Sequence, residues 1–386
     1  MRRIGVFTGS RANYSSTKTI IRGLANDPDV EVVSIVGGAA TLKRYGQVDK
    51  LMVLDGLPKP SFKFNMFIDG EGHADMAKSC GLGLMEMSTI LDNAALDGLV
   101  VVGDRYDVMA PAVAAAYMNI PLIHTMGGEV TGTIDESIRH AITKFANIHL
   151  VANDDARQRV VKMGERARDV YTVGCPRLDL VKEAVARDTL TNEEFKSKYP
   201  GVGAEIDIEN EFLLCSFHPV TTAADDLRDQ VDKLMEALSA ISMPTIMLWP
   251  NFDAGGNDVA KSIRTFREKY SPSWLNLQTN FSVEDYSRLM NRTKCLVGNS
   301  SSGIREGAFL GTPVVNIGSR QERRLRGKNV LDVKATVSEI KSGIEAQCRI
   351  GKRTGSDLYG DGNTGERITN ILKTFTVQNT QKTIAY

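Results

Sequence analysis

Residues 297–318 read VGNSSSGIREGAFLGTPVVNIG, and this segment tells more about the fold than any other part of the chain. It predicts a buried strand ending at Val297, a polar turn of glycine and serine, a short helix and a second buried strand. A turn of small residues that opens a helix presents backbone N–H groups and hydroxyls at the positive end of the helix dipole. The turn is therefore suited to a phosphate, although it could instead be a capped helix entry of any parallel sheet.

The same segment carries an acidic residue on its predicted helix. Glu306 follows the serine turn by one to two helical turns, where its carboxylate can accept hydrogen bonds from the vicinal hydroxyls of a ribose. Phosphate donors followed by a diol acceptor are what a nucleotide requires. We therefore expect this segment to bind a nucleotide.

Strands and helices alternate on both sides of this segment. Continuous apolar runs separated by helical patterns are typical of parallel strands that are covered on both faces. The predicted strands are residues 4–8, 30–36, 99–102, 121–124 and 148–151 in the first half, then 212–217 and 245–249 before the nucleotide segment. This alternation predicts an α/β protein with two Rossmann-like halves and a cleft between them.

The length of 386 residues also suits two domains. Gly174-Cys175-Pro176 closes the first unit, so an N-terminal domain is predicted at residues 1–176 and a C-terminal, nucleotide-binding domain at 177–363. Residues 177–210 are charged and lack strong strand signals, which indicates a connector. The last predicted helix, near residues 366–375, is expected to pack with the rest of 364–386 on the first domain.

Composition argues against several kinds of partner. Lys+Arg 47 and Asp+Glu 47 give no formal net charge, and no basic stripe is present, so a nucleic-acid polymer is not expected to bind. The five cysteines are scattered without a CxxC pair, which indicates reduced thiols in a cytosolic protein and neither disulfides nor a zinc site. No apolar run approaches the roughly 20 residues that span a bilayer, so we expect a cytoplasmic protein without a membrane partner.

In the first half, polar residues gather where predicted strands end, which is where open parallel sheets bind ligands. Arg11 follows the opening strand and can pair with a pyrophosphate or remain a surface arginine. Asp104 follows the apolar strand 99–102 and can serve as an acid or base, or cap the next helix. Glu129 and Asp135 lie in the richest loop, and Asp135 could also be a helix cap. Several carboxylates together are what proton movement on two sides of a sugar carbon would require.

Two polar clusters of the second half occupy corresponding positions. His218 follows the first strand of that half, where a protonated imidazole could stabilise a departing pyrophosphate or be purely structural. Asn251 lies in a polar turn after the next strand and can bind a ligand or set the turn. The first loop, Gly9 to Tyr14, is not GxGxxG, so a dinucleotide cofactor is poorly supported.

In this order, the clusters resemble the hydrolysing UDP-N-acetylglucosamine 2-epimerase family, particularly its sialic-acid-type branch, from about Ile4 to Phe375. The most specific pieces are GDR at 103–105, GGEVTGTIDESIRHA at 127–141, HPVTT at 218–222, and GNSS at 298–301 followed by Arg305-Glu306. The resemblance implies a GT-B fold that binds UDP mainly through the second domain. It implies no cofactor and no metal, and a homodimer or homotetramer is expected.

The resemblance also implies a reaction. UDP-N-acetylglucosamine would lose UDP and be inverted at C2, giving free N-acetylmannosamine for nonulosonic (sialic-type) acid biosynthesis. The C2 proton is not adjacent to a carbonyl, so simple deprotonation is not expected. Instead UDP leaves, an acid-base residue takes the C2 proton to give a 2-acetamidoglucal, and water adds from the other face.

Residue roles follow from the resemblance by position. Asp104 and Asp135 look like acid-base residues, and Glu129 is a further catalytic candidate. His218 and Arg11 look like partners of the leaving group and the phosphates. The remaining predicted substrate contacts are Ser300 and Ser301 with phosphate, Glu306 with the ribose, and Arg105, Asn251 and Arg320, the last in a segment similar to the family's nucleotide or regulatory surface.

Three positions depart from the pattern of relatives. Met126 stands where many relatives carry a glutamate, so either Glu129 replaces that carboxylate, or Asp104 and Asp135 act alone, or the substrate differs. Asn13 stands where relatives often have aspartate, and residues 38–41 read GAAT where a histidine is usual. A more apolar sugar pocket would suit a UDP- or GDP-linked 2,4-diacetamido-2,4,6-trideoxyhexose. The same motifs would also suit a GT-B glycosyltransferase or a catalytically impaired nucleotide-sugar-binding protein.

Overall fold

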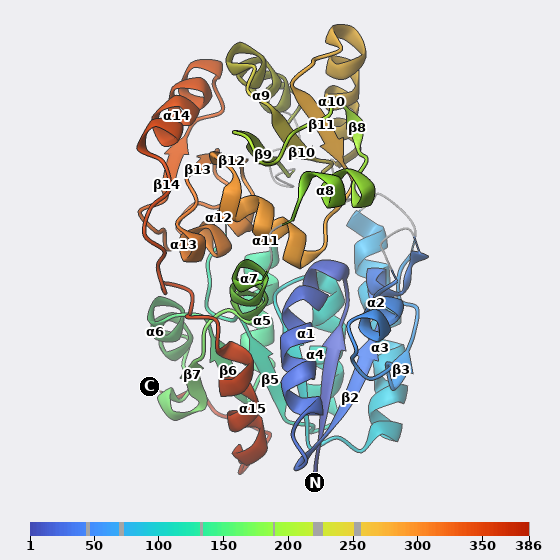
Figure 1. Ribbon diagram of the computed structural model, residues 1–386. Coiled ribbons are helices and arrows are strands. Elements are labelled where there is room, and N and C mark those ends of the chain that lie inside the picture. Colours follow the sequence, from blue (N-terminus) through green and yellow to red (C-terminus); the bar gives the residue numbers. More distant parts are fainter. Residues whose placement is uncertain are drawn as a thin grey trace. The chain divides into compact units, whose positions relative to one another are not determined.

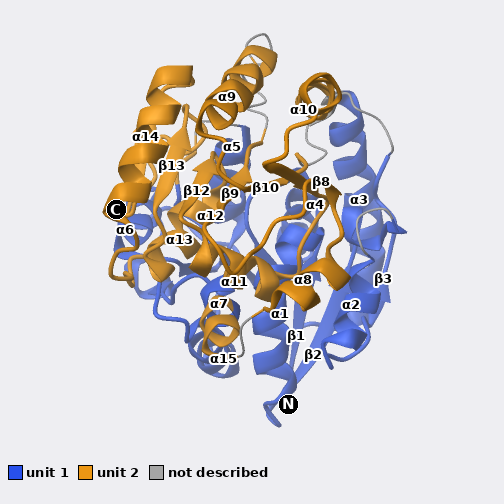
Figure 2. Ribbon diagram, turned by 45° about the horizontal axis from the view of Figure 1, so that its top comes forward, with its two compact units in different colours: residues 1–129, 134–180, 360–386 blue, residues 130–133, 181–359 orange. Residues whose placement is uncertain are grey.

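The computed structural model describes residues 1–43, 47–68, 73–131, 134–187, 190–218, 227–250 and 256–385. The chain divides into two compact units, shown in different colours in Figure 2. Unit 1 comprises Met1–Glu129, Ile134–Leu180 and Gly360–Tyr386, and unit 2 comprises Val130–Thr133 and Val181–Tyr359. Each unit is built around one sheet (Figure 1).

The sheet of unit 1 has the strand order β3-β2-β1-β4-β5-β6-β7, and all of its neighbouring strands are parallel. Its strands are β1 (Arg2–Thr8), β2 (Val30–Val36), β3 (Phe62–Lys63), β4 (Gly98–Val102), β5 (Leu122–Thr125), β6 (Ile148–Val151) and β7 (Val170–Thr172). The central strands β4, β5 and β6 are buried along their whole length, which is why apolar residues dominate them even though β5 includes His124 and Thr125 and β6 includes His149.

The helices of unit 1 are α1 (Arg11–Ala25), α2 (Val48–Leu54), α3 (His73–Ala94), α4 (Tyr106–Tyr117), α5 (Ile134–Phe145), α6 (Asp154–Lys162) and α15 (Thr364–Thr374), with 3₁₀ turns η1 (Gly38–Thr41) and η3 (Ala167–Asp169). The last helix, α15, packs against α1, and Asp179 accepts hydrogen bonds from the backbone N–H groups of Thr364 and Gly365 at its start. A segment from the C-terminal end of the chain thereby completes the first unit.

The sheet of unit 2 has the order β14-β13-β12-β9-β10-β11-β8, in which only the short edge strand β8 is antiparallel to its neighbour among the described strands. Its strands are β8 (Val202–Gly203), β9 (Leu213–Ser216), β10 (Thr245–Leu248), β11 (Leu275–Gln278), β12 (Cys295–Gly298), β13 (Val314–Ile317) and β14 (Val330–Val333). The order β11-β10-β9-β12-β13-β14 repeats the 3-2-1-4-5-6 order of a Rossmann fold, as β3-β2-β1-β4-β5-β6 does in unit 1.

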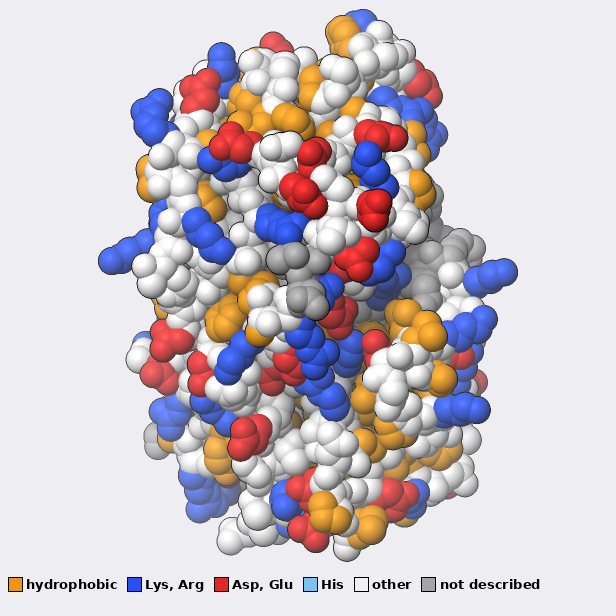
Figure 3. Space-filling view, in the orientation of Figure 1, with side chains coloured by type: hydrophobic (Ala, Val, Ile, Leu, Met, Phe, Trp, Pro, Cys, Tyr) orange, Lys and Arg blue, Asp and Glu red, His pale blue; other side chains and the backbone are white. Residues whose placement is uncertain are grey.

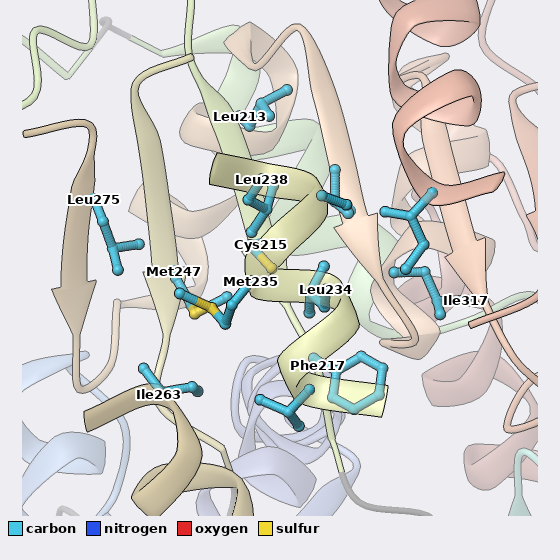
Figure 4. Close-up of a cluster of buried hydrophobic side chains, with 14 of the residues drawn as sticks. Leu213, Cys215, Phe217, Leu234, Met235, Leu238, Met247, Ile263, Leu275 and Ile317 are labelled. Carbon is cyan, nitrogen blue, oxygen red and sulfur yellow. The ribbon is translucent and has the colours of Figure 1, made fainter. Parts of the chain in front are cut away.

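The helices of this second half are α7 (Arg177–Ala186), which crosses the unit boundary, α8 (Asn192–Lys198), α9 (Leu227–Ile241), α10 (Gly256–Tyr270), α11 (Val283–Arg292), α12 (Ser301–Ile304), α13 (Glu306–Leu310) and α14 (Val337–Ile350). Leucines of α9 pack on the apolar side chains of β9, and Figure 4 shows Leu234 and Leu238 beside Cys215. Burial raises the pKa of the Cys215 thiol to about 12, so this cysteine behaves as a small apolar core residue.

The predicted α/β class with two Rossmann-like halves is confirmed. Residues 177–210, which the sequence indicates to be a connector, contain α7, α8 and the short edge strand β8. Figure 3 shows Lys and Arg interspersed with Asp and Glu over the visible face, as the balanced composition predicts. None of the helices in the described ranges is both long and apolar enough to cross a bilayer.

Candidate active site

Each sheet has one point at which the strand order reverses direction. In unit 1 this point lies between β1 and β4, and in unit 2 it lies between β9 and β12. The loops that leave the carboxyl ends of such neighbouring strands diverge, which opens a crevice for ligands in open α/β sheets. Arg11 and Asp104 follow β1 and β4, and His218 and the serine turn follow β9 and β12, so these predicted site residues lie at the two reversal points.

In unit 2, a glycine allows β12 to approach β9 closely. Gly298 has φ +135°, and a Cβ atom there would lie 2.1 Å from the carbonyl oxygen of Ser216. Gly298 pairs with Ser216 in the parallel register, so the residues that follow the two strands also lie side by side. Asn299 and His218 are brought together in this way.

The amide of Asn299 then binds the backbone of His218 at two points. Its Oδ1 accepts a hydrogen bond from the His218 backbone N–H at 2.7 Å, and its Nδ2 donates to the His218 carbonyl at 2.8 Å. The imidazole Nε2 of His218 lies 3.2 Å from the hydroxyl of Ser216. His218 is therefore held by the ends of both strands.

The backbone carbonyl of Asn299 binds two further side chains of the predicted nucleotide region. Arg320 donates to it through Nη1 at 3.2 Å, and Gln321 donates through Nε2 at 2.9 Å. Asn299 thus joins His218 to the segment that carries Arg320. Sequence reasoning placed Arg320 in the site but did not single out Asn299 or Gln321.

The predicted serine turn begins a helix, as expected. Ser300 is the N-cap of α12, and its Oγ accepts a hydrogen bond from the Ser302 backbone N–H at 3.3 Å. Ser302 Oγ lies 2.9 Å from both Ser300 Oγ and the hydroxyl of Tyr286. Ser300 and Ser301 are half-buried. The hydroxyl of Ser302 connects Ser300 to Tyr286, and neither Ser302 nor Tyr286 was identified from the sequence.

Glu306 does not lie on the same helix as the serine turn, which corrects the prediction. Arg305 separates α12 from α13, with φ −95° and ψ −68°, and Glu306 is the first residue of α13. The Glu306 side chain is only 3% exposed. A buried carboxylate directly after the serine turn still satisfies the chemistry of a ribose acceptor.

In unit 1, the first loop is anchored by Asn13. Its Nδ2 donates to the carbonyl of Val102 at the end of β4 at 2.8 Å, and its Oδ1 accepts from the Gly9 N–H at 3.3 Å. Relatives often carry an aspartate at this position, and an ionised aspartate could not donate to the Val102 carbonyl. The amide of Asn13 therefore joins the ends of β1 and β4. Arg11 is the first residue of α1 in the same loop and is partly exposed.

Asp104 makes an ion pair with a fully buried arginine. Arg139 of α5 donates to Asp104 Oδ2 through Nε at 2.9 Å and also through Nη2. The Nη1 group of the same guanidinium donates to the backbone carbonyl of Glu129 at 2.6 Å. Asp135 lies one turn before Arg139 on α5, and of the three predicted carboxylates Asp104 is the one for which a contact with the guanidinium is described.

Two other predicted residues of this region have local structural roles. Arg105 is the N-cap of α4, and its Nε lies 3.7 Å from Oδ1 of the buried Asp107. Met126 follows β5 with φ +69°, a left-handed conformation that side chains seldom adopt, and it is buried. A buried thioether therefore occupies the position where relatives were expected to carry a carboxylate.

His124 of β5 contacts the residue that precedes Asp104. Its Nε2 is 2.8 Å from the Gly103 carbonyl, and its Nδ1 is 3.2 Å from Thr143 Oγ1. Burial lowers the pKa of His124 to about 3, which outweighs the opposing effect of the Gly103 hydrogen bond. Arg139 and His124 belong to motifs recognised in the sequence, but their contacts with residues 103 and 104 could not be read from it. Asn251 and residues 219–222 lie outside the described residues.

Comparison with known proteins adds to this geometry. A family model described as UDP-N-acetylglucosamine 2-epimerase matches residues 22–373. The UDP-N,N'-diacetylbacillosamine 2-epimerase (hydrolyzing) of Legionella pneumophila is 31% identical over 389 residues, which cover 97% of this chain and 96% of that protein. The UDP-N-acetylglucosamine 2-epimerase of Neisseria meningitidis serogroup B is 31% identical over 364 residues, covering 94% and 92%.

Solved structures show the same fold. The crystal structure of the Neisseria meningitidis UDP-GlcNAc 2-epimerase bound to UDP-GlcNAc superposes with a TM-score of 0.82 at 15% identity, covering 96% of this chain and 99% of that one. A Methanocaldococcus jannaschii UDP-GlcNAc 2-epimerase in complex with UDP-GlcNAc and UDP gives a TM-score of 0.78 at 18% identity, with 96% and 99% covered. The predicted GT-B-like architecture is confirmed by these matches.

Proposed function

Since the chain belongs to the UDP-N-acetylglucosamine 2-epimerase family, as its motifs predicted, we propose that it is a hydrolysing 2-epimerase of a UDP-linked 2-acetamido sugar. The overall reaction consumes the sugar nucleotide and water and releases UDP and the free sugar inverted at C2. The observation that carries the proposal is that Arg139 binds the carboxylate of Asp104 and the backbone carbonyl of Glu129, while Asp135 lies one turn before Arg139 on the same helix. Acid-base residues on more than one side of a sugar carbon are what inversion requires.

The first step we propose is elimination of UDP. The bond between C1 and the UDP oxygen breaks, and a carboxylate takes the proton from C2, leaving a double bond between C1 and C2. Asp104 is the favoured acceptor, because two N–H groups of Arg139 hold its carboxylate in one orientation. His218 would stabilise the charge that develops on the leaving pyrophosphate.

The second step is addition of water. Water adds to C1 and loses a proton to solvent, while a second acid delivers a proton to C2 from the opposite face, which gives the inverted sugar. Exchange with solvent then reprotonates the second acid and removes the proton that the first carboxylate took. Glu129 and Asp135 are the candidates for this acid. In this proposal Arg11 and Arg105 contact the phosphates or the sugar, while Ser300, Ser301 and Arg320 hold the pyrophosphate and Glu306 binds the ribose. Asn251 remains a proposed contact that lies outside the described residues.

UDP-N-acetylglucosamine, giving N-acetylmannosamine for nonulosonic acid biosynthesis, is the first substrate we propose. A UDP- or GDP-linked 2,4-diacetamido-2,4,6-trideoxyhexose is the second, and two observations favour it. Met126 places a buried apolar side chain in the loop that carries Glu129. The Legionella relative, which is named for UDP-N,N'-diacetylbacillosamine, matches over 97% of the chain.

A substrate panel tests the function. The purified protein is incubated with UDP-N-acetylglucosamine, the UDP- and GDP-linked diacetamido sugars, and no acceptor. Nucleotide release is followed by chromatography, and the sugar is identified by NMR. We expect stoichiometric nucleotide and a free 2-epimeric sugar from at least one of the three. Release that depends on an added acceptor would identify a glycosyltransferase, and UDP binding without turnover would identify a nucleotide-sugar-binding protein.

A further inference from the structure

We propose that Arg139 and His124 are positioning residues that together hold Asp104, one through its carboxylate and the other through the preceding carbonyl. The inference rests on the proposed function, in which Asp104 takes the C2 proton. Neither residue is assigned to contact the substrate. Their effect on the reaction would be carried entirely by the orientation and charge of Asp104.

The carboxylate is held through a single oxygen. Arg139 is 0% exposed and directs both Nε and Nη2 at Asp104 Oδ2, whereas the Asp104 side chain is 24% exposed. Two donors on one oxygen restrict rotation of the carboxylate and so set the direction of Oδ1.

The same guanidinium holds the neighbouring loop. Its third N–H group, on Nη1, donates to the Glu129 carbonyl at 2.6 Å. One rigid, planar group therefore joins the carboxylate of Asp104 to the backbone of the loop that carries Glu129. A lysine could not reproduce this arrangement, since its ammonium lacks the planar fork.

His124 holds the backbone just before Asp104. Carbonyl oxygens only accept hydrogen bonds, so Nε2 of His124 carries the proton that is donated to the Gly103 carbonyl at 2.8 Å. Gly103 has φ +90°, a conformation that favours glycine. The hydrogen bond from His124 holds its carbonyl in one direction. Thr143 Oγ1 lies 3.2 Å from His124 Nδ1 and 3.0 Å from the Arg139 carbonyl, and its single hydrogen can be donated to either of these two acceptors.

The first test is chemical rescue of Arg139→Ala. Removing the side chain opens space beside a partly exposed carboxylate, which added guanidinium ion can reach. We expect kcat to fall about a hundredfold, the scale of a misplaced catalytic group, while KM and the Kd for UDP change far less. Millimolar guanidinium chloride should restore part of kcat, and sodium chloride at equal ionic strength should not.

The matched control is Arg157→Ala, which removes an arginine of unit 1 that donates to the carbonyls of Val170 and Ala167 instead of to an acid. It should keep its turnover and show no response to guanidinium. If Arg139→Ala had the wild-type kcat, the inference would be wrong, but the proposed function would stand. Absence of sugar-nucleotide turnover in the wild-type protein would overturn the proposed function, and the inference with it.

A second pair of variants tests His124 and also serves if Arg139→Ala does not fold. His124→Gln retains an N–H donor close to the position of Nε2, whereas His124→Leu retains the bulk but no donor. We expect His124→Gln to keep most of the wild-type kcat and His124→Leu to lose it, with unchanged binding of UDP. Equal kcat in the two variants would show that the Gly103 hydrogen bond does not position Asp104.

Discussion

Asn299 binds both backbone polar groups of His218. The Asn299 Oδ1 atom accepts from the His218 N–H at 2.7 Å, and Nδ2 donates to the His218 carbonyl at 2.8 Å. Because the Asn299 side chain is only 1% exposed, water does not compete for these contacts. A residue on the loop after β12 therefore sets the backbone of the proposed leaving-group partner after β9.

We predict that Asn299→Asp lowers turnover although it preserves the size of the side chain. The second carboxylate oxygen would face the His218 carbonyl, and a buried acceptor without a donor costs about 1–3 kcal/mol. His218→Ala provides the reference, because loss of one charge-stabilising group typically costs about a hundredfold to a thousandfold in kcat. Both variants should bind UDP. An Asn299→Asp protein with a lower Tm and the wild-type kcat would limit Asn299 to a structural role.

Glu306→Ala should weaken the binding of UDP itself. A buried carboxylate that accepts from a ribose diol contributes roughly 1.5–3 kcal/mol per hydrogen bond, so the Kd should rise at least about tenfold. Calorimetric titration with UDP measures this directly. The exposed Glu322→Ala is the matched control in the same unit and should bind as the wild type does. Unchanged affinity in Glu306→Ala would remove this residue from the ribose site.

Met126→Glu should slow the reaction on UDP-N-acetylglucosamine. The new carboxylate would be buried three residues from Glu129, and like charges in a buried loop raise the pKa of one another. Met126→Gln has nearly the same shape without the charge and separates the two effects, so it should be the more active variant. A clear gain in turnover with Met126→Glu would instead indicate that a catalytic carboxylate is missing from this position.

The last prediction concerns acid stability and a buried ion cluster in unit 1. Glu165, 4% exposed, contacts His149, Lys144 and Lys382. Burial by itself would raise the pKa of Glu165, but hydrogen bonds from these three partners outweigh it and lower the pKa to about 2 from its ordinary 4.5. A folded-state pKa below the unfolded value means that the stabilisation is complete above pH 4.5 and is lost as the pH falls toward 2.

Glu165→Gln should therefore show a shallower loss of unfolding free energy than the wild type over that pH range. Chemical denaturation at several pH values measures the difference. Glu345→Gln, an exposed acid of unit 2, is the control and should follow the wild-type curve. Parallel curves for Glu165→Gln and wild type would show that this carboxylate does not govern acid stability.

The sequence predicted strands best where both faces of the sheet are covered. The predicted range 30–36 agrees with β2 although Glu31 and Ser34 interrupt its apolar residues, and the unbroken apolar run 99–102 differs from β4 by one residue. β11 was missed because Asn276 and Gln278 interrupt its apolar pattern. Both are buried, and they satisfy their amides with the carbonyls of Ala204 and Tyr199, partners that lie far away in the sequence.

The candidate site was predictable only in part for the same reason. Loops at strand ends can be located from the strands, so Asp104, His218 and the serine turn were all identified. The groups that hold them depend on contacts across the fold: Arg139 is 35 residues from Asp104, and Asn299 is 81 residues from His218. A pattern of residue types along the chain does not encode such pairings.

The central claim is that turnover breaks both the bond to UDP and the C2–H bond, and proton NMR in deuterated water tests it most directly. The wild-type protein is incubated with the substrate identified in the panel, and the C2 position of the released sugar is followed together with UDP. We predict one UDP per sugar, inverted C2 and deuterium at C2, with Asp104→Asn showing no deuterium incorporation and no glucal. Release of a sugar that retains its original hydrogen and configuration at C2 would contradict the account.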